Sequence, residues 1–100
     1  MEPGEVNLPI EIKRDINVAI DILLRYGAHE VYLFGSLARG KSRLGSDIDI
    51  ATVGLPKNRF FAAYGELLTD LRNPFDLVDL DYDNDFARDV RTQGGFLRVA

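Results

Sequence analysis

Apolar and polar residues alternate along this chain in two patterns, one typical of helices and one typical of strands. Apolar residues recur every three or four positions from Pro9 to Tyr26, and again from Asn58 to Leu71. This spacing puts them on one face of an amphipathic helix. The positions assigned to the interior are Ile12, Ile16, Ala19, Ile20 and Leu23 in the first helix and Phe60, Phe61, Tyr64, Leu67, Leu68 and Leu71 in the second.

Three shorter apolar stretches, residues 30–34, 47–53 and 75–81, are predicted strands. Residues 37–40 have room for little more than one helical turn, and a last helix is expected over residues 84–93, before two glycines. Residues 96–99 could add a short strand or dock on a partner, and residues 1–8 are expected to be a loose lead-in. The order of elements predicts an α+β fold, a small mixed sheet with helices packed on one side.

Composition narrows the class of protein. One hundred residues make one expected domain over 1–100, with a core just large enough to stand alone. The chain has no cysteine, which excludes disulfides and thiolate metal sites and fits a cytoplasmic location. No apolar run approaches a membrane span. The net charge of −4 and the lack of a basic face argue against a stand-alone nucleic-acid binder, although a local basic loop stays open.

Candidate chemistry gathers at the first two predicted strands. Gly35-Ser36 follows the first strand, and Asp47-Ile48-Asp49 begins the second. Side chains alternate along a strand, so the two carboxylates point to one side and lie about 7 Å apart. Oxygen ligands of this kind suit Mg²⁺. A glycine lets a phosphate approach the backbone, and a serine that begins a helix favours an anion. Together these parts suit phosphoryl or nucleotidyl transfer.

Each half of this arrangement is a weak signal by itself, because Gly-Ser is a common turn and Asp-X-Asp is often a solvated strand edge. Their combination is more specific. Gly35-Ser36, ten residues, and then Asp47-X-Asp49, in the string FGSLARGKSRLGSDIDIA, resembles the nucleotidyltransferase fold of the DNA polymerase beta superfamily. The string is similar to that of the minimal nucleotidyltransferases, the MNT group. Because those proteins are themselves about this size, the resemblance covers nearly the whole chain.

The basic loop between the two halves holds further candidates. Arg39 lies one helical turn beyond Ser36, where its guanidinium could reach a phosphate. For Lys41 and Arg43, a solvated loop is as good an interpretation as a phosphate contact. The resemblance implies that Ser46, the serine before the first aspartate, also belongs to the nucleotide site. His29 is expected to be structural or solvated.

The third carboxylate offers a choice between Asp76 and Asp79, which lie on opposite strand faces. An amphipathic interpretation would place Asp79 and Asp81 in water and turn Asp76 towards the core, where an unpaired carboxylate is costly. The resembled family has a similar apolar-Asp-Leu-Val string, which Phe75-Asp76-Leu77-Val78 matches. Asp76 is therefore the chosen ligand, with Asp79 in reserve.

The resemblance implies a nucleotidyltransferase that moves AMP from ATP to a protein hydroxyl. Asp47, Asp49 and Asp76 would be the catalytic, Mg²⁺-binding carboxylates, and Gly35, Ser36, Arg39 and Ser46 would hold the triphosphate. The implied partner is a HEPN-domain toxin, with this chain as the antitoxin of a HEPN–MNT pair, and the two could assemble into an oligomer. Two alternatives stay open: a binding module that neutralises a partner by contact, and a nucleotidyltransferase for a small molecule.

Overall fold

A computed structural model describes residues 8–35, 47–81 and 97–100. The helices and strands within these residues are α1 (Ile10–Arg25), β1 (Glu30–Phe34), β2 (Ile48–Val53), α2 (Lys57–Asp70), β3 (Phe75–Asp79) and β4 (Leu97–Arg98). Both long helices therefore lie within one residue of their predicted bounds. The predicted turn at 37–40 and the predicted helix at 84–93 fall outside the described residues.

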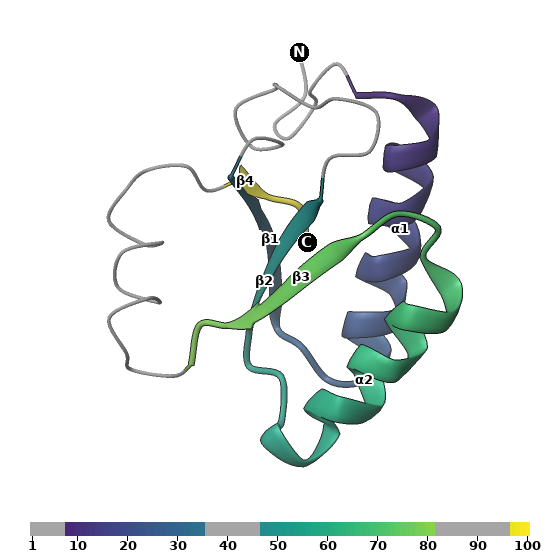
Figure 1. Cartoon of the computed structure of the whole chain (residues 1–100). Coiled ribbons are helices and arrows are strands. Elements are labelled where there is room, and N and C mark those ends of the chain that lie inside the picture. The colour runs from purple at the N-terminus through teal and green to yellow at the C-terminus, as the bar shows by residue number, and fades with distance from the viewer. Residues whose placement is uncertain (1–7, 36–46, 82–96) are drawn as a thin grey trace.

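The described strands form one mixed sheet in the order β3-β2-β1-β4. β2 runs parallel to β3, whereas β1 is antiparallel to both β2 and β4. Both α1 and α2 lie on the same side of this sheet (Figure 1). The predicted α+β fold, with a small mixed sheet and helices on one side, is confirmed. Of the two alternatives for residues 96–99, the structure shows the short strand, which pairs with β1.

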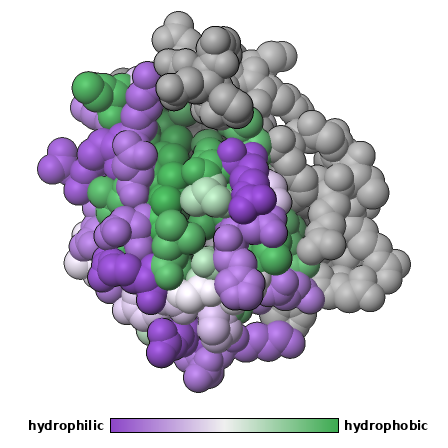
Figure 2. Space-filling view, turned by 180° about the vertical axis from the view of Figure 1, so that it is seen from behind, coloured by the Kyte–Doolittle hydropathy of each residue, from purple (hydrophilic) through white to green (hydrophobic). Residues whose placement is uncertain are grey.

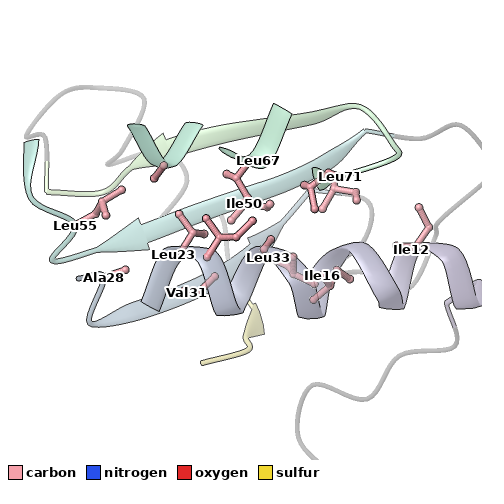
Figure 3. Packing of buried hydrophobic residues seen from close by; sticks show 14 of the residues in the cluster. Ile12, Ile16, Leu23, Ala28, Val31, Leu33, Ile50, Leu55, Leu67 and Leu71 are labelled. Atoms are coloured by element: carbon pink, nitrogen blue, oxygen red, sulfur yellow. The ribbon is translucent and has the colours of Figure 1, made fainter. Parts of the chain in front are cut away.

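The main core lies between the sheet and the two helices. Its residues come from the inward face of each element, and Figure 3 shows Leu23 of α1 beside Ile50 of β2. The predicted interior of α1 is largely confirmed, because Ile12, Ile16, Ala19 and Leu23 are buried. Leu8 is also buried, at 8% exposure, so the prediction of a loose lead-in was wrong at that residue.

The prediction for α2 was too broad. Phe61 and Leu68 were assigned to the interior, yet they are 83% and 61% exposed. The buried positions of the helix and its C-cap are Ala63, Leu67 and Leu71, spaced four residues apart. Such a spacing makes a narrow stripe, since only one line of the helix faces the sheet.

Hydrophobic residues also reach the surface on the side shown in Figure 2, as a band bordered by hydrophilic residues.

The opposite face of the sheet carries a second, smaller apolar cluster. Its buried members are Ala51 and Leu80, with Tyr32, Phe34, Val53 and Val78 packed against them. Neither α1 nor α2 covers this face (Figure 1). Because side chains alternate along a strand, Asp49 shares this face with Ala51, and Asp76 shares it with Val78. Neither α1 nor α2 therefore packs against the face that carries Asp49 and Asp76.

Asp15 is a buried carboxylate in the second turn of α1, with no exposed surface. Its oxygens accept hydrogen bonds from the backbone N–H of Arg72 (3.0 and 3.2 Å) and of Asn73 (2.9 Å). They also accept from the Asn73 side-chain amide and from the Arg14 guanidinium, both at 2.8 Å. Burial by itself would raise the pKa of Asp15, but these hydrogen bonds together lower that pKa below its ordinary value. The carboxylate thus ties α1 to the segment between α2 and β3.

Neither of the two helices in the described ranges is long and apolar enough to cross a membrane.

Two adjacent leucines of α1, one buried and one exposed, provide a test of the described core. Leu23 has no exposed surface, whereas Leu24 is 44% exposed. We expect Leu23→Ala to lower the free energy of unfolding by about 2–5 kcal/mol, because it removes buried contacts and leaves a cavity. Leu24→Ala should change it by no more than about 0.5 kcal/mol. Urea denaturation followed by circular dichroism measures both, and equal losses for the two variants would contradict the described burial.

Candidate functional site

The site forms where β1 ends beside the start of β2. The two strands are antiparallel, and Phe34, the last residue of β1, is the register partner of Asp49. Gly35 follows at once and therefore lies at the same end of the sheet as Asp49. The two halves of the sequence motif are separated in the chain, but Gly35 from the first half and Asp49 from the second lie at the same end of the sheet.

Gly35 is a position where the absence of a side chain matters. Its φ angle is +70°, in the left-handed region that residues with a Cβ adopt only at a cost. A Cβ placed there would lie 3.3 Å from the Cγ of Asp49 and would collide with the carboxylate oxygen Oδ2. Glycine therefore permits both the turn and the close approach of the backbone to Asp49.

The parallel pairing of β2 with β3 brings a second carboxylate to Asp49. Asp76 is its register partner, so the two residues lie on adjacent strands about 4.8 Å apart at their Cα atoms. Both side chains point to the same sheet face, away from α1 and α2. Asp76 is exposed and Asp49 is half-buried. Asp47 is exposed and comes just before the first residue of β2.

Asp79 occupies a different environment. It pairs with Thr52 in the sheet, on the face that packs against the helices, and is only 8% exposed. One of its oxygens accepts the backbone N–H of Asp81 at 2.8 Å. The amphipathic interpretation of this strand was therefore wrong, because Asp79 is buried and Asp76 faces outward. The face of Asp76 matches the choice made from the family resemblance, whereas its role as a metal ligand stays a prediction.

The surroundings of Asp49 shift the pKa of its carboxyl group. Burial raises its pKa above the ordinary aspartate value, and the negative charges of Asp76 and Asp47 raise it further. Among the residues that the structure describes, no cation contributes to this shift. The ionised form of Asp49 is therefore disfavoured in the folded protein, and a cation at this position would remove that penalty.

The ligand types suit a divalent cation, but they do not form a closed cage. Three carboxylates without nitrogen or sulfur donors are the oxygen-only set that Mg²⁺ prefers. Among the residues that the structure describes, no three acidic, histidine or cysteine side chains stand close enough to hold a metal ion. Asp49 and Asp76 are paired in the sheet, while Asp47 acts on Asp49 through its charge. Such an open site leaves coordination positions for water and for phosphate oxygens.

The other predicted nucleotide contacts, Ser36, Arg39 and Ser46, lie outside the described residues, as do Lys41 and Arg43. His29 is exposed, which fits the expectation that it is solvated. Sequence analysis passed over Asp15, which connects to this site through the segment before β3. The signal was available: Asp15 stands three residues after Ile12 and four before Ala19, which makes it a charged residue on the apolar face of its helix.

Two glycines give opposite predictions for the same substitution. Gly35→Ala should lower the free energy of unfolding by about 1–2 kcal/mol, since alanine at a positive φ is strained. It should also displace the Asp49 carboxylate. Gly65 lies inside α2 with nothing within 4 Å of its would-be Cβ. Gly65→Ala should therefore stabilise the protein by about 0.5–1 kcal/mol. Thermal unfolding of both variants measures the difference, and a neutral Gly35→Ala would contradict the described turn.

Comparisons with solved structures find the same fold in nucleotidyltransferases and in toxin–antitoxin complexes. A crystal structure of a toxin–antitoxin with AMP-PNP superposes with a TM-score of 0.65 at 26% identity, covering 82% of this chain and 69% of that one. A candidate minimal nucleotidyltransferase gives a TM-score of 0.65 at 22% identity over 96% of this chain and 99% of that one. The MNT antitoxin complex with the tri-AMPylated HEPN toxin of Shewanella oneidensis gives 0.61 at 23% identity, over 86% and 69% of the two chains.

No curated protein matches the sequence significantly. The family model described as polymerase beta, nucleotidyltransferase, matches residues 17–98, a stretch that includes every described strand and α2. The chain therefore belongs to the polymerase beta nucleotidyltransferase family.

Proposed function

We propose that this protein is a Mg²⁺-dependent nucleotidyltransferase that moves AMP from ATP to a hydroxyl group of a HEPN-domain partner protein. The observation that carries the proposal is the pairing of Asp49 with Asp76 on a sheet face that α1 and α2 leave uncovered, with Gly35 at the same strand end. Neighbouring carboxylates that repel each other lower stability, so their presence side by side is better explained by binding than by folding.

The proposed reaction assigns a separate task to each part of the site. Asp47, Asp49 and Asp76 would hold the metal, which when bound neutralises charge on the triphosphate and on the leaving pyrophosphate. The backbone at Gly35 would approach the phosphates, with Ser36, Arg39 and Ser46 as further contacts. The acceptor hydroxyl oxygen forms a new bond to the α-phosphorus, and the bond from that phosphorus to pyrophosphate breaks. The hydroxyl proton passes to a carboxylate of the site.

The choice of donor and acceptor follows from what similar chains are bound to. One solved relative is a toxin–antitoxin with AMP-PNP, which is an ATP analogue, and another holds a tri-AMPylated HEPN toxin with its MNT antitoxin. These assemblies make ATP the preferred donor and a HEPN protein the preferred acceptor for this chain. A module that neutralises its partner by contact alone and an enzyme for a small-molecule acceptor are the alternatives, and the transfer assay below separates them.

Removing the first two carboxylates should abolish transfer. We expect the Asp47→Asn, Asp49→Asn double variant to lose AMP transfer to the partner toxin, because two of the three carboxylates proposed to hold the metal are then absent. The apo variant should melt slightly higher than the wild type, since it lacks two repelling charges. Labelled ATP, Mg²⁺ and the co-purified partner provide the assay, and wild-type transfer should also vanish when the metal is chelated.

Several outcomes of this assay decide between the alternatives. A double variant that labels its partner at the wild-type rate refutes the assignment of these carboxylates. If the variant does not label the toxin but still neutralises it in cells, the contact module is the better description. Transfer to a small molecule in the absence of any protein acceptor would favour the third alternative.

The third carboxylate can be tested with a matched pair from one strand. Asp76→Asn should abolish transfer and weaken Mg²⁺–ATP binding, because it removes the carboxylate beside Asp49. Asp79→Asn should leave most of the transfer intact, since that side chain faces the helices and not the site. Calorimetry with Mg²⁺–ATP, together with the labelling assay, reads both variants. The reverse pattern would mean that Asp79 is the ligand.

A further inference from the structure

We propose that Asp15 is a positioning residue for the carboxylates of the site: it holds the α2–β3 segment so that Asp76 enters the sheet beside Asp49. The proposal rests on the proposed function, since it concerns the geometry of that same site. Asp15 is buried on α1, on the helix side of the sheet, and it makes no direct contact with Asp49 or Asp76 in its described hydrogen bonds.

The first step of the argument is the contact between Asp15 and the segment. α2 ends at Asp70 and β3 begins at Phe75, so residues 71–74 form the whole connection. The helix stops because Leu71 adopts an extended backbone, with ψ 142°. The next two backbone N–H groups, of Arg72 and Asn73, therefore have no helical acceptor. Both donate instead to the Asp15 carboxylate.

The second step is the contact between the segment and β2. The carbonyl of Pro74 accepts the backbone N–H of Ile48 at 2.9 Å. Ile48 is the residue between Asp47 and Asp49, and its register partner in β3 is Phe75. One residue of the segment thus receives a hydrogen bond from the middle of the Asp-X-Asp motif. Its neighbour Asn73 is held by Asp15 through both its backbone and its side chain.

The third step is the consequence for Asp76, which comes three residues after Asn73 in the chain. A slip of β3 by one residue would turn Asp76 to the helix side of the sheet. Asp15 opposes such a slip, because its two oxygens receive four hydrogen bonds from residues 72 and 73. Arg14 adds a further tie, since its guanidinium contacts both Asp15 (2.8 Å) and the Asp70 carbonyl (3.0 Å). A carboxylate suits this task because an acceptor-only group can serve several N–H donors at once.

The test replaces the acceptor and keeps its shape. Asp15→Asn puts an NH₂ group against N–H donors, so at least one contact becomes repulsive. The matched control is Asp21→Asn on the same helix, where the carboxylate is exposed and pairs only with Arg25 at the surface in its described contacts. Leu23→Ala controls for a general loss of stability. Asn73→Ala, which deletes only the side-chain donor to Asp15, is a milder second variant in case Asp15→Asn does not fold.

Two readouts distinguish positioning from plain stability. In the metal-free protein, hydrogen exchange at the Ile48 amide should become faster in Asp15→Asn and Asn73→Ala, and should stay slow in Asp21→Asn. In Leu23→Ala it should rise by no more than the loss of global stability accounts for, whereas in Asp15→Asn it should rise by more than that. By calorimetry, the dissociation constant of Mg²⁺–ATP should rise about tenfold in Asp15→Asn, as is typical when a support of metal ligands is removed. The two controls should bind Mg²⁺–ATP like the wild type.

The outcomes separate this proposal from the proposed function. If Mg²⁺–ATP binds Asp15→Asn as tightly as the wild type, Asp15 has no positioning role. Weakened binding of equal size in Leu23→Ala would also overturn it, because general destabilisation would then explain the effect. If the wild-type protein binds no Mg²⁺–ATP, the proposed function fails. The exchange of Ile48 would in that case still decide whether Asp15 holds β2 against β3.

Discussion

The parallel pairing of β2 with β3 is the constraint on which the rest of this molecule depends. It makes Asp49 and Asp76 neighbours, although they are far apart in the chain and separated by α2. A parallel pair needs a long crossover between its strands, and here that crossover is α2 with its short connections. The packing of α2 through Ala63, Leu67 and Leu71 therefore supports the site indirectly, because it returns the chain to the sheet in the correct register.

One face of β2 belongs to the main core, and the other face carries a carboxylate of the candidate site. β2 places Ile48 and Ile50 in the main core, with almost no exposure. Asp49, between them in the chain, is subject to the negative charges of Asp76 and Asp47. Burial and the neighbouring aspartates raise the pKa of Asp49, so the ionised form of this side chain stabilises the folded state less than its protonated form does. The apolar contacts on the opposite face offset that difference. This is the usual arrangement at a site where strain or charge serves binding instead of folding.

Sequence reasoning located the elements well, because helix and strand periodicity depend on nearby residues. It also brought together Gly35 and Asp49, since the two motif halves end and begin adjacent strands. Its errors arose where long-range packing decides. Periodicity could not show that Phe61 and Leu68 lie on the outer side of α2, because their spacing fits the interior as well as the surface. The environments of Asp76 and Asp79 depend on which face the helices cover, which an amphipathic pattern with carboxylates on both faces does not reveal.

The position of the described pocket bears on what the acceptor would be. That pocket is lined by Lys57, Phe60, Phe61 and Asp79, at the start of α2 and the end of β3. Asp79 and Asp76 point to opposite sheet faces, so this hollow lies on the helix side and does not open onto the carboxylates. A small acceptor bound there would not reach Asp49. This pocket therefore gives no support to a small-molecule acceptor in the proposed reaction.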